Sequence, residues 1–471
     1  MMRRTNSTTR HGTPRAAASR VQWRPDDRYG VLLTAVMWTL LVLMIVPEGF
    51  DYSLLANVEP PASGSALSRA LWIGLLGSGV LVILWRAPLA WLYLRSLNPF
   101  LLLFAGLALA SVLWSIVPQL TLRRCIRLIT IVVDCVAFVL VAWDGRRFQS
   151  VMRPILTLVL LGSIVFGILR PSLAIHQETS AELLNAWHGL TNHKNSLGAL
   201  SCLAIIFWFH GWLAREVRTV PALVGGGIAV TCLMLSRSAT SAMAAVAVLP
   251  FMLVLMRSPA GLRPWLPYLV GAVIAMLVMY TLAVLHLIPG VSILLSPISA
   301  ITGKDLSFTG RTEIWSVLTE HIREHPLLGT GYGAYWSGAS SPFARMNAFY
   351  PGSAHNGYLE VLNDLGWVGL LCLLGCIWSY ARQSLRVFAA SASQGALYIG
   401  LLVQQGLTNL SETHWMSVLS VDFVVMTLAM TALGRAILDQ RLSMRFGRPA
   451  AQRSGARGSA PACARTAARM R

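Results

Sequence analysis

The sequence is poor in charged residues. Asp, Glu, Lys and Arg make up only 12% of its 471 residues, about half the share of roughly 25% that is usual for soluble domains. So few charges cannot cover the water-facing surface of the two or three soluble domains that this length allows. Hydrophobic residues make up 55% of the chain and the mean hydropathy is +0.61. The composition therefore excludes a soluble protein and indicates a membrane protein with many spans.

Acidic residues, cysteines and internal repeats are also scarce. Nineteen acidic residues stand against 38 basic ones, which gives a formal net charge of +19. In a soluble chain this excess would indicate a nucleic-acid partner, but the basic residues gather in the tails and short connections, which is typical of membrane topology. Six of the seven cysteines lie in apolar runs, without the spacing of a disulfide framework or a zinc site. The absence of a visible repeat weighs against a transporter with duplicated halves.

Long apolar runs are abundant. About twelve of them approach the length that crosses roughly 30 Å of hydrocarbon, and continuous runs of this kind form helices because a bilayer leaves no backbone group unpaired. We therefore predict an all-α polytopic membrane protein with about 12 transmembrane helices in residues 29–434. The tails, 1–28 and 435–471, are predicted to be disordered. The runs are 31–46, 67–85, 97–117, 125–143, 153–169, 196–214, 219–235, 238–256, 265–289, 357–380, 394–410 and 416–434.

The distribution of basic residues predicts the orientation. With the N-terminus placed in the cytoplasm, 27 of the 38 Lys and Arg residues fall on the cytoplasmic side. Cytoplasmic loops and tails are enriched in Lys and Arg, so both termini are predicted to face the cytoplasm. Residues 31–46 continue without a small-residue cleavage site, which indicates a first span rather than a removed signal peptide.

One connection is far longer than the others. Residues 290–356, on the predicted outer side, form a loop of about 65 residues, well above the usual few. Residues 305–325 have helix-compatible periodicity, and the glycines of 329–333 indicate a tight turn rather than a phosphate loop, since no strand precedes them. Eight of the ten histidines are predicted on this side. Because histidine accepts protons near neutral pH, we predict a reaction at this surface.

Three cations lie on the same outer side, although membrane topology selects against them there: Lys194, Arg237 and Arg311. Arg237 sits in a connection so short that its guanidinium must stay near the membrane face. A guanidinium at that depth is costly unless it meets an anion, and its fork suits the oxygens of a phosphate or diphosphate. The alternative is snorkelling to lipid headgroups, or an ion pair with Glu313 or Glu412.

Several short motifs follow one another between residues 192 and 369. The motifs are Asn192-His-Lys-Asn195, Ser236-Arg-Ser238, Gly310-Arg311 with Ile314-Trp315, His325-Pro-Leu-Leu-Gly-Thr-Gly-Tyr-Gly333, and His355-Asn356 followed after nine residues by Gly366-Trp-Val-Gly369. In this order they resemble the O-antigen ligase and polysaccharide polymerase family of bacterial inner-membrane proteins, and within it the succinoglycan-type exopolysaccharide polymerases. By topology the resemblance extends over residues 30–434.

The resemblance implies a membrane glycosyltransferase whose site faces the periplasm. Its donor would be an oligosaccharide linked to undecaprenyl pyrophosphate and its acceptor a sugar hydroxyl on another glycan, with inversion at the anomeric carbon. It implies neither a metal nor another cofactor, and no nucleic acid. Membrane lipid, a flippase and a chain-length regulator are the further partners that it implies.

The resemblance also assigns roles to individual residues. His355 would orient or deprotonate the acceptor hydroxyl, while Arg237 and Arg311 would clamp the departing diphosphate, where fixed cations are most effective if water is excluded. A helix over 355–365 would put His355 on one face with Tyr358, and Gly366 would let a neighbouring helix approach closely. The residues with implied substrate contacts are Lys194, Asn195, His193, Asn356 and Tyr332, and the aromatic side chains Trp315, Tyr332, Tyr335 and Trp336 are candidates for stacking on sugar rings.

Other functions stay open at this point. An O-antigen ligase would use the same donor and transfer the glycan to lipid A core. A flippase or other transporter would need ionisable groups deep along several spans, whereas the chain has few, and interhelical hydrogen bonds are predicted for Asp134 and Asp422. His321 and His325 have the spacing of a metal pair but lack a third ligand, so a solvated face is favoured. The polar residues on one side favour an enzyme, and the motifs favour a polymerase.

Overall fold

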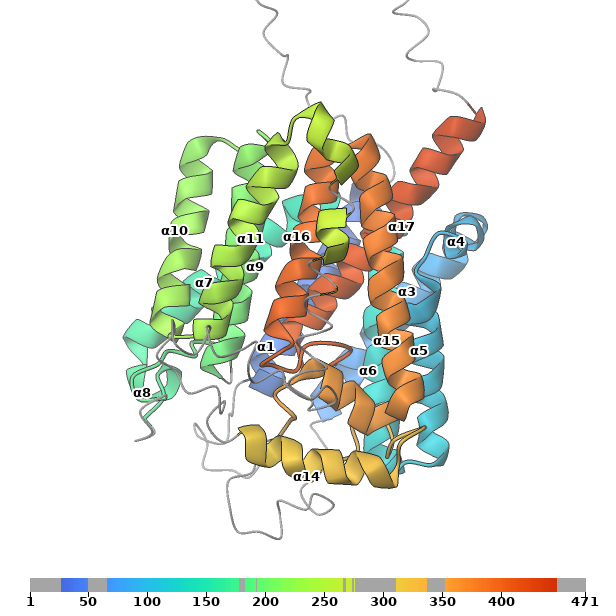
Figure 1. The fold of residues 1–471 in the computed structure, drawn as a ribbon, viewed down its shortest axis with the longest axis vertical. Helices are drawn as coiled ribbons and strands as arrows, with labels where there is room; N and C mark the ends of the chain where they lie inside the picture. Colours follow the sequence, from blue (N-terminus) through green and yellow to red (C-terminus); the bar gives the residue numbers. More distant parts are fainter. Residues whose placement is uncertain are drawn as a thin grey trace, which may run out of the picture.

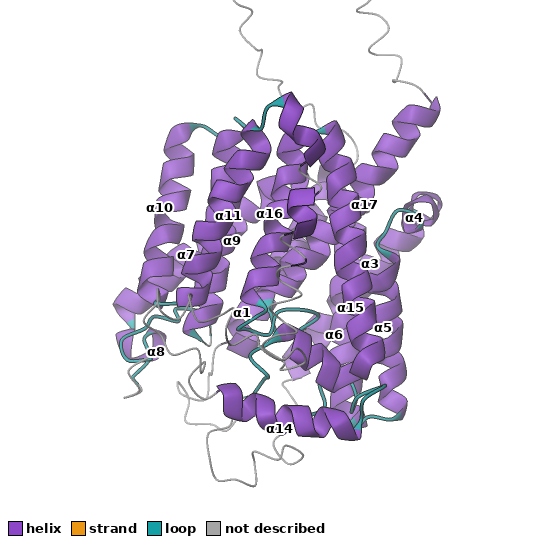
Figure 2. Cartoon of the chain, viewed as in Figure 1, coloured by secondary structure: helices purple, strands orange, loops and turns teal. Residues whose placement is uncertain are grey.

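The computed structural model describes residues 27–49, 66–177, 183–191, 193–265, 268–272, 275, 311–336 and 352–446 of the chain. Over these residues the chain is helical with connecting loops, and no strand forms (Figure 2). An isolated β-bridge joins Ile175 and Trp187. The prediction of an all-α fold is confirmed.

The helices follow one another along the chain with short connections. In the first half they are α1 (Asp27–Gly49), α3 (Ala66–Trp85), α4 (Ala87–Leu94), α5 (Pro99–Ala110), the 3₁₀ turn η1 (Ser111–Leu113), α6 (Pro118–Leu140), α7 (Arg147–Leu169) and α8 (Pro171–Ala174). In the second half they are α9 (Lys194–Leu213), α10 (Thr219–Ser236), α11 (Ala239–Arg257), the 3₁₀ turn η2 (Ala260–Trp265), α14 (Arg311–Glu324), α15 (Gly357–Ala390), α16 (Ala392–Thr408) and α17 (Val421–Phe446).

Several of these helices can cross a membrane. Among the described residues, α3, α7, α9, α10, α11, α15 and α17 are long and apolar enough, and the bent pair formed by α4 and α5 with η1 makes an eighth candidate. Predicted spans 31–46, 125–143 and 394–410 coincide with α1, α6 and α16, which do not meet that test by themselves. Most of the predicted span 265–289 lies outside the described residues. The polytopic architecture is confirmed, and a total of about 12 spans stays a prediction.

The bundle has a mainly apolar interior with some buried polar side chains, and apolar side chains also cover its outside. Within the candidate spans, 89% of the α17 window is buried and only 17% of the α3 window, so α17 is central and α3 peripheral. Large apolar side chains such as Leu223 and Val246 are exposed, as expected for helices that face lipid. Asp422 of α17 accepts a hydrogen bond from Gln405 of α16 at 2.8 Å, which confirms that prediction. For Asp134 the prediction is wrong, because its buried carboxyl has no hydrogen-bond partner among the described residues.

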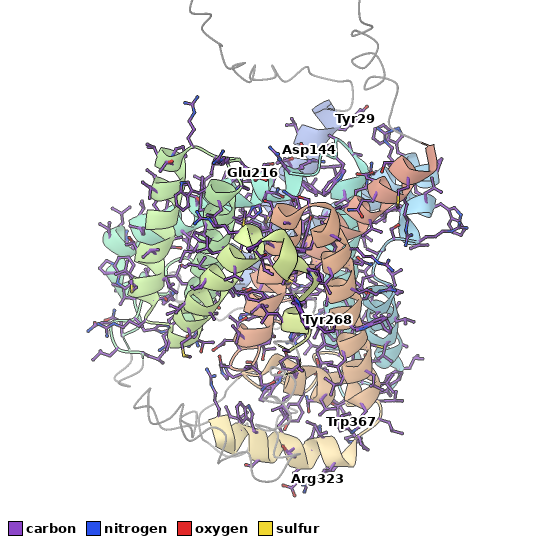
Figure 3. All side chains as sticks on the ribbon, turned by 45° about the horizontal axis from the view of Figure 1, so that its top comes forward. Tyr29, Asp144, Glu216, Tyr268, Arg323 and Trp367 are labelled. Atoms are coloured by element: carbon purple, nitrogen blue, oxygen red, sulfur yellow. The ribbon has the colours of Figure 1, made fainter. Side chains whose placement is uncertain are left out.

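The two ends of the bundle differ. α14 lies across one end, roughly perpendicular to the long helices, and contacts α15 (Figure 1). We call this the α14 end and the opposite one the far end. Figure 3 places Arg323 and Trp367 at the α14 end and Tyr29 and Glu216 at the far end. α1 begins and α17 ends at the far end, as the predicted topology requires of a chain whose termini share one side.

The boundary of the C-terminal tail is a correction. The prediction ends the membrane domain at residue 434, but α17 continues to Phe446. A buried face continues past the predicted boundary, since Ile437 and Leu438 are 4% exposed. The remainder of both tails, and the outer-loop residues 290–310 and 337–351, lie outside the described residues.

α15 is broken near its start. Gly366 has φ 62° and ψ −163°, a conformation that interrupts the helix and is open mainly to glycine. The glycine-rich segment 325–333 crosses this break, and the N–H of Trp367 donates to the carbonyl of Pro326 at 2.9 Å. A Cβ at residue 366 would come within 2.3 Å of the facing backbone. The close neighbour of Gly366 is therefore this turn, and the predicted approach of another helix is wrong.

Candidate functional site

His355 lies two residues before α15, at the α14 end. Its backbone is left-handed, with φ 47°, a conformation that is uncommon for a residue with a Cβ and that gathers at functional positions. Asn356 is the N-cap of α15, and its Oδ1 accepts hydrogen bonds from the N–H groups of Tyr358 (3.0 Å) and Leu359 (3.1 Å). Since the helix begins at Gly357, His355 is not part of the helical face on which the sequence predicted it.

A half-buried carboxylate, Glu412, stands at the centre of three predicted site residues. Its Oε1 accepts hydrogen bonds from Asn195 Nδ2 at 2.5 Å and from Arg311 Nη2 at 3.0 Å. Its Oε2 lies 3.5 Å from His355 Nδ1. Asn195 comes from the first turn of α9, Arg311 from α14, and His355 from the segment before α15. One carboxylate thus connects three elements that are far apart in sequence.

The segment that carries Glu412 joins α16 to α17 and is fixed by Asn409. The Oδ1 atom of Asn409 accepts from the N–H of His414 at 2.9 Å, and its carbonyl accepts from the N–H of Gly357 at 3.0 Å. A Cβ at residue 357 would lie 2.0 Å from Asn409 Oδ1, so this contact requires glycine. The start of α15 and the Glu412 segment are therefore held against each other through their backbones.

The electrostatics of the cluster keep Glu412 ionised and His193 neutral. Burial raises the pKa of Glu412, but the hydrogen bond and charge of His355 together with the charge of Arg311 lower it, and the pKa is about 2. His193, the N-cap of α9, has a pKa lowered to about 4 because burial outweighs the nearby Glu412 charge. Its Nδ1 accepts from the N–H of Asn195 at 3.2 Å, as a neutral imidazole can.

Arg237 lies at the same end but outside this cluster. It is the left-handed C-cap of α10, with φ 50°, and its exposed guanidinium donates to the carbonyl of Leu184 at 3.1 Å. Three residues further on, Thr240 Oγ1 is 2.8 Å from Ser411 Oγ, next to Glu412. The structure therefore brings Arg311 and His355 together and leaves Arg237 at the surface of a neighbouring connection.

The other predicted contact residues occupy different positions. Lys194 begins α9, and its N–H donates to His176 Nε2 at 3.3 Å. Asn356 is buried and engaged as the helix cap. Tyr332 is buried as well, and its hydroxyl donates to the carbonyl of Met416. Since Trp315, Tyr335 and Trp336 are also buried, none of these four rings offers an exposed face for a sugar, and the substrate-binding role of Tyr332 stays a prediction.

The sequence gives Glu412 only as an alternative ion-pair partner for the outer cations, and the structure confirms that pairing for Arg311. Glu412 follows His355 by 57 residues and shares no motif with it, so only the fold reveals that the two meet. Arg124 of α6 is a second residue near the predicted site to which no sequence motif points. It lines a cavity together with Tyr332, Glu360 and Asp364. For Glu360 and Asp364 the sequence does contain a signal. Two carboxyl groups one helical turn apart at the start of a predicted span are energetically costly unless they have partners.

The histidines and acidic residues do not form a metal site within the described residues. Over the part of the chain that the structure describes, no group of three or more His, Cys, Asp and Glu side chains is arranged to hold a metal ion. His321 and His325 have ring centroids 5.5 Å apart, and His321 Nδ1 faces Glu324 at 3.6 Å. His321 lies in the last turn of α14 and His325 directly follows the helix.

Comparison with known proteins agrees with the motifs. Residues 224–374 match the model of the O-antigen ligase family, a stretch that contains Arg237, Arg311 and His355. Over 286 residues the chain is 31% identical to the exopolysaccharide production protein ExoQ of Rhizobium meliloti (strain 1021), a match that covers 57% of this chain and 61% of that protein. The match thus spans less than two thirds of the relative's length. The predicted resemblance to O-antigen ligases and exopolysaccharide polymerases is confirmed.

Proposed function

We propose that the chain is a glycosyltransferase that polymerises undecaprenyl-pyrophosphate-linked repeat units into an exopolysaccharide at the periplasmic face of a bacterial inner membrane. The observation that carries this proposal is the meeting of Arg311 and His355 on the carboxylate of Glu412 at one end of a membrane bundle. Such a transfer needs a guanidinium that binds the anionic diphosphate and an imidazole that accepts the proton of the acceptor hydroxyl. Both termini then face the cytoplasm, and the α14 end faces the periplasm.

The reaction step follows from the chemistry of these groups. The acceptor hydroxyl oxygen attacks the anomeric carbon of the donor, and its proton passes to the Nε2 atom of His355. The bond from that carbon to the diphosphate oxygen breaks, and the diphosphate leaves with the electron pair. Direct attack inverts the anomeric carbon. Glu412, which faces Nδ1 of His355, holds the imidazole so that Nε2 is the accepting nitrogen.

The cationic side chains Arg311, Arg237 and Lys194 are the proposed contacts of the diphosphate. Arg311 is 19% exposed, so it stays accessible to a diphosphate while Glu412 fixes its direction. Arg237, exposed near the membrane face, and Lys194 at the start of α9 lie on connections from which they can hold the lipid-linked anion. Because a lipid diphosphate is already an activated leaving group, this chemistry uses no nucleotide sugar and no resident metal.

The polymerase is preferred over two other functions. ExoQ, by its name, acts in exopolysaccharide production, which supports chain growth rather than transfer to lipid A core, although a ligase would use the same donor and base. A flippase would need a polar path through the bundle, whereas Glu412 pairs with Arg311 of α14, the helix that lies across one end (Figure 1). A flippase and a chain-length regulator are expected to act beside the polymerase rather than within it.

Replacement of Arg311 or His355 by Ala tests the proposal. Each variant should lose polymer at least on the order of 10²-fold, because one removes the diphosphate contact and the other the proton acceptor. The measurement is glycan length in membrane vesicles that carry the host's own lipid-linked repeat units, normalised to inserted protein. Trp367→Phe, at the same end and outside the cluster, is the control. Normal chain lengths from His355→Ala would remove the proposed base.

A further inference from the structure

The left-handed conformation of His355 is held from the residue before it. Ala354 is fully buried, and both of its backbone polar groups are bound by side chains. Its N–H donates to Oε2 of Glu360 at 2.7 Å, and its carbonyl accepts from Nε1 of Trp315 at 2.9 Å. Since Asn356 on the other side is fixed as the cap of α15, His355 lies between two anchored neighbours. Its φ of 47° is therefore imposed by the surroundings.

The two side chains that bind Ala354 come from different helices. Glu360 lies in the first turn of α15 and is 8% exposed, while Trp315 lies in α14 and is 7% exposed. Trp315 follows Arg311 by four residues, so the two side chains share one face of α14. A hydrogen bond from Trp315 to Ala354 consequently fixes the distance between the helix that carries Arg311 and the loop that carries His355.

We propose that Glu360 and Trp315 are positioning residues that set the imidazole of His355 against the guanidinium of Arg311. This inference rests on the proposed function and deepens it, because neither residue touches the reacting atoms. Without the acceptor of Glu360 or the donor of Trp315, the segment 352–356 relaxes towards ordinary backbone conformations. His355 then leaves its place beside Glu412, and a displacement of about 1 Å in a reacting group is enough to lower a rate on the order of 10²-fold.

The first test uses variants of Glu360 in the full-length chain. Glu360→Ala removes the acceptor, and we expect elongation in vesicles carrying the host's lipid-linked repeat units to fall on the order of 10²-fold. Glu360→Gln keeps a carbonyl acceptor, and we expect its rate to stay within about fivefold of the parent. An equal loss in both variants would overturn the proposal, since the carboxylate charge rather than the hydrogen bond would then be responsible.

A second measurement reads the hydrogen bond without any substrate. Amide hydrogen exchange of residues 352–356 in the purified protein should be about tenfold faster in Glu360→Ala and near the parent value in Glu360→Gln. Trp315→Phe removes the hydrogen bond from α14 to the carbonyl of Ala354 and keeps a buried ring. It is the test variant if Glu360→Ala does not fold. It should lower the elongation rate about tenfold, with Trp367→Phe as the matched control. Unchanged exchange and unchanged elongation in Trp315→Phe would overturn the proposal.

The failure of this inference is distinguishable from a failure of the proposed function. His355→Ala is measured in the same vesicles. If His355→Ala is inactive while Glu360→Ala and Trp315→Phe elongate normally, the proposed base stands and the positioning role is wrong. If His355→Ala elongates normally, the proposed function itself is wrong, whatever the exchange data show.

Discussion

Two glutamates at opposite ends of the bundle have similar partners and different surroundings. Glu216, at the far end (Figure 3), forms an ion pair with Arg153 and accepts hydrogen bonds from Gln149 at 3.1 Å and Gln394 at 3.2 Å. Glu412, at the α14 end, also combines an arginine with a side-chain amide. In both clusters the partners come from helices that are distant in sequence, so each carboxylate joins several elements of the bundle.

The clusters differ in how much of them is accessible. The side chains of Arg153 and Glu216 are 6% and 5% exposed, and Arg153 also donates to the carbonyl of Phe207 at 3.2 Å. Around Glu412, the side chains of Arg311 and His355 are 19% and 21% exposed. Arg146, whose Nε lies 3.8 Å from Glu216 Oε1, is 71% exposed. The far-end cluster is thus sealed around Arg153 and open at Arg146, whereas the cluster at the α14 end leaves both its cation and its imidazole partly exposed.

The difference shows which property indicates function. The pKa of Glu216 is lowered too, because the hydrogen bond and charge of its partners overcome the effect of burial. A lowered pKa is therefore common to both glutamates and does not separate an active site from a structural ion pair. Exposure of an arginine does not separate them either, since Arg146 is exposed beside Glu216. Of the two glutamates, Glu412 is the one that faces a partly exposed imidazole on a left-handed backbone, that of His355.

The largest effect is expected from Glu412→Ala. This change releases both Arg311 and His355, and polymer formation should fall on the order of 10²- to 10³-fold. The measurement is the elongation rate per inserted protein in vesicles. Glu412→Gln, which keeps an acceptor oxygen without the charge, should lie between Glu412→Ala and the parent. A near-normal rate for Glu412→Ala would reduce this glutamate to a structural partner like Glu216.

Glu216→Ala should show the opposite behaviour. It leaves Arg153 buried without its carboxylate, and the free energy of unfolding should fall by about 3 kcal/mol. The elongation rate of the folded fraction should stay within about threefold of the parent, because the site lies at the other end of the bundle. Denaturant unfolding in detergent and elongation in vesicles are measured on the same preparation. A loss of rate at unchanged stability would mean that the two ends are coupled, and the comparison would fail.

A smaller effect is expected from pH. The folded-state pKa of Glu412 is about 2, below its ordinary value near 4.5. Between these values the unfolded chain binds more protons, so the stability from Glu412 is complete above pH 4.5 and is lost as the pH falls towards 2. The unfolding midpoint of Glu412→Gln should lack this dependence in the same window. Parallel curves for parent and variant from pH 6 to pH 3 would contradict the assigned pKa.

The sequence predicts the bundle better than it predicts the site. Helices could be located because spans need continuous apolar runs, and the sidedness of Lys and Arg predicts which connections share an end. The prediction was weaker where helices carry charge or bend. α6 has Arg123, Arg124, Arg127 and Asp134 within it, and the break of α15 at Gly366 depends on a turn more than thirty residues earlier.

The site itself could be predicted only in part. Arg311, His355 and Asn195 lie in recognisable motifs, and the fold brings them together. Their common partner comes from a connection without such a motif, because a single carboxylate has no local pattern. The left-handed backbone conformation of His355 could not be predicted either, because it follows from side chains of α14 and α15 that meet only in the folded protein.

The break in α15 has a consequence for where the sugars are joined. At about 1.5 Å per residue, the 34 residues of this helix would extend well beyond the hydrocarbon layer if they were straight. The part of α15 after Gly366 is by itself long enough to cross this layer. The first nine residues of the helix are then expected to lie outside the layer. On the proposed function, a donor that reaches His355 has to raise its glycan clear of the acyl chains while its polyprenyl tail stays immersed in them.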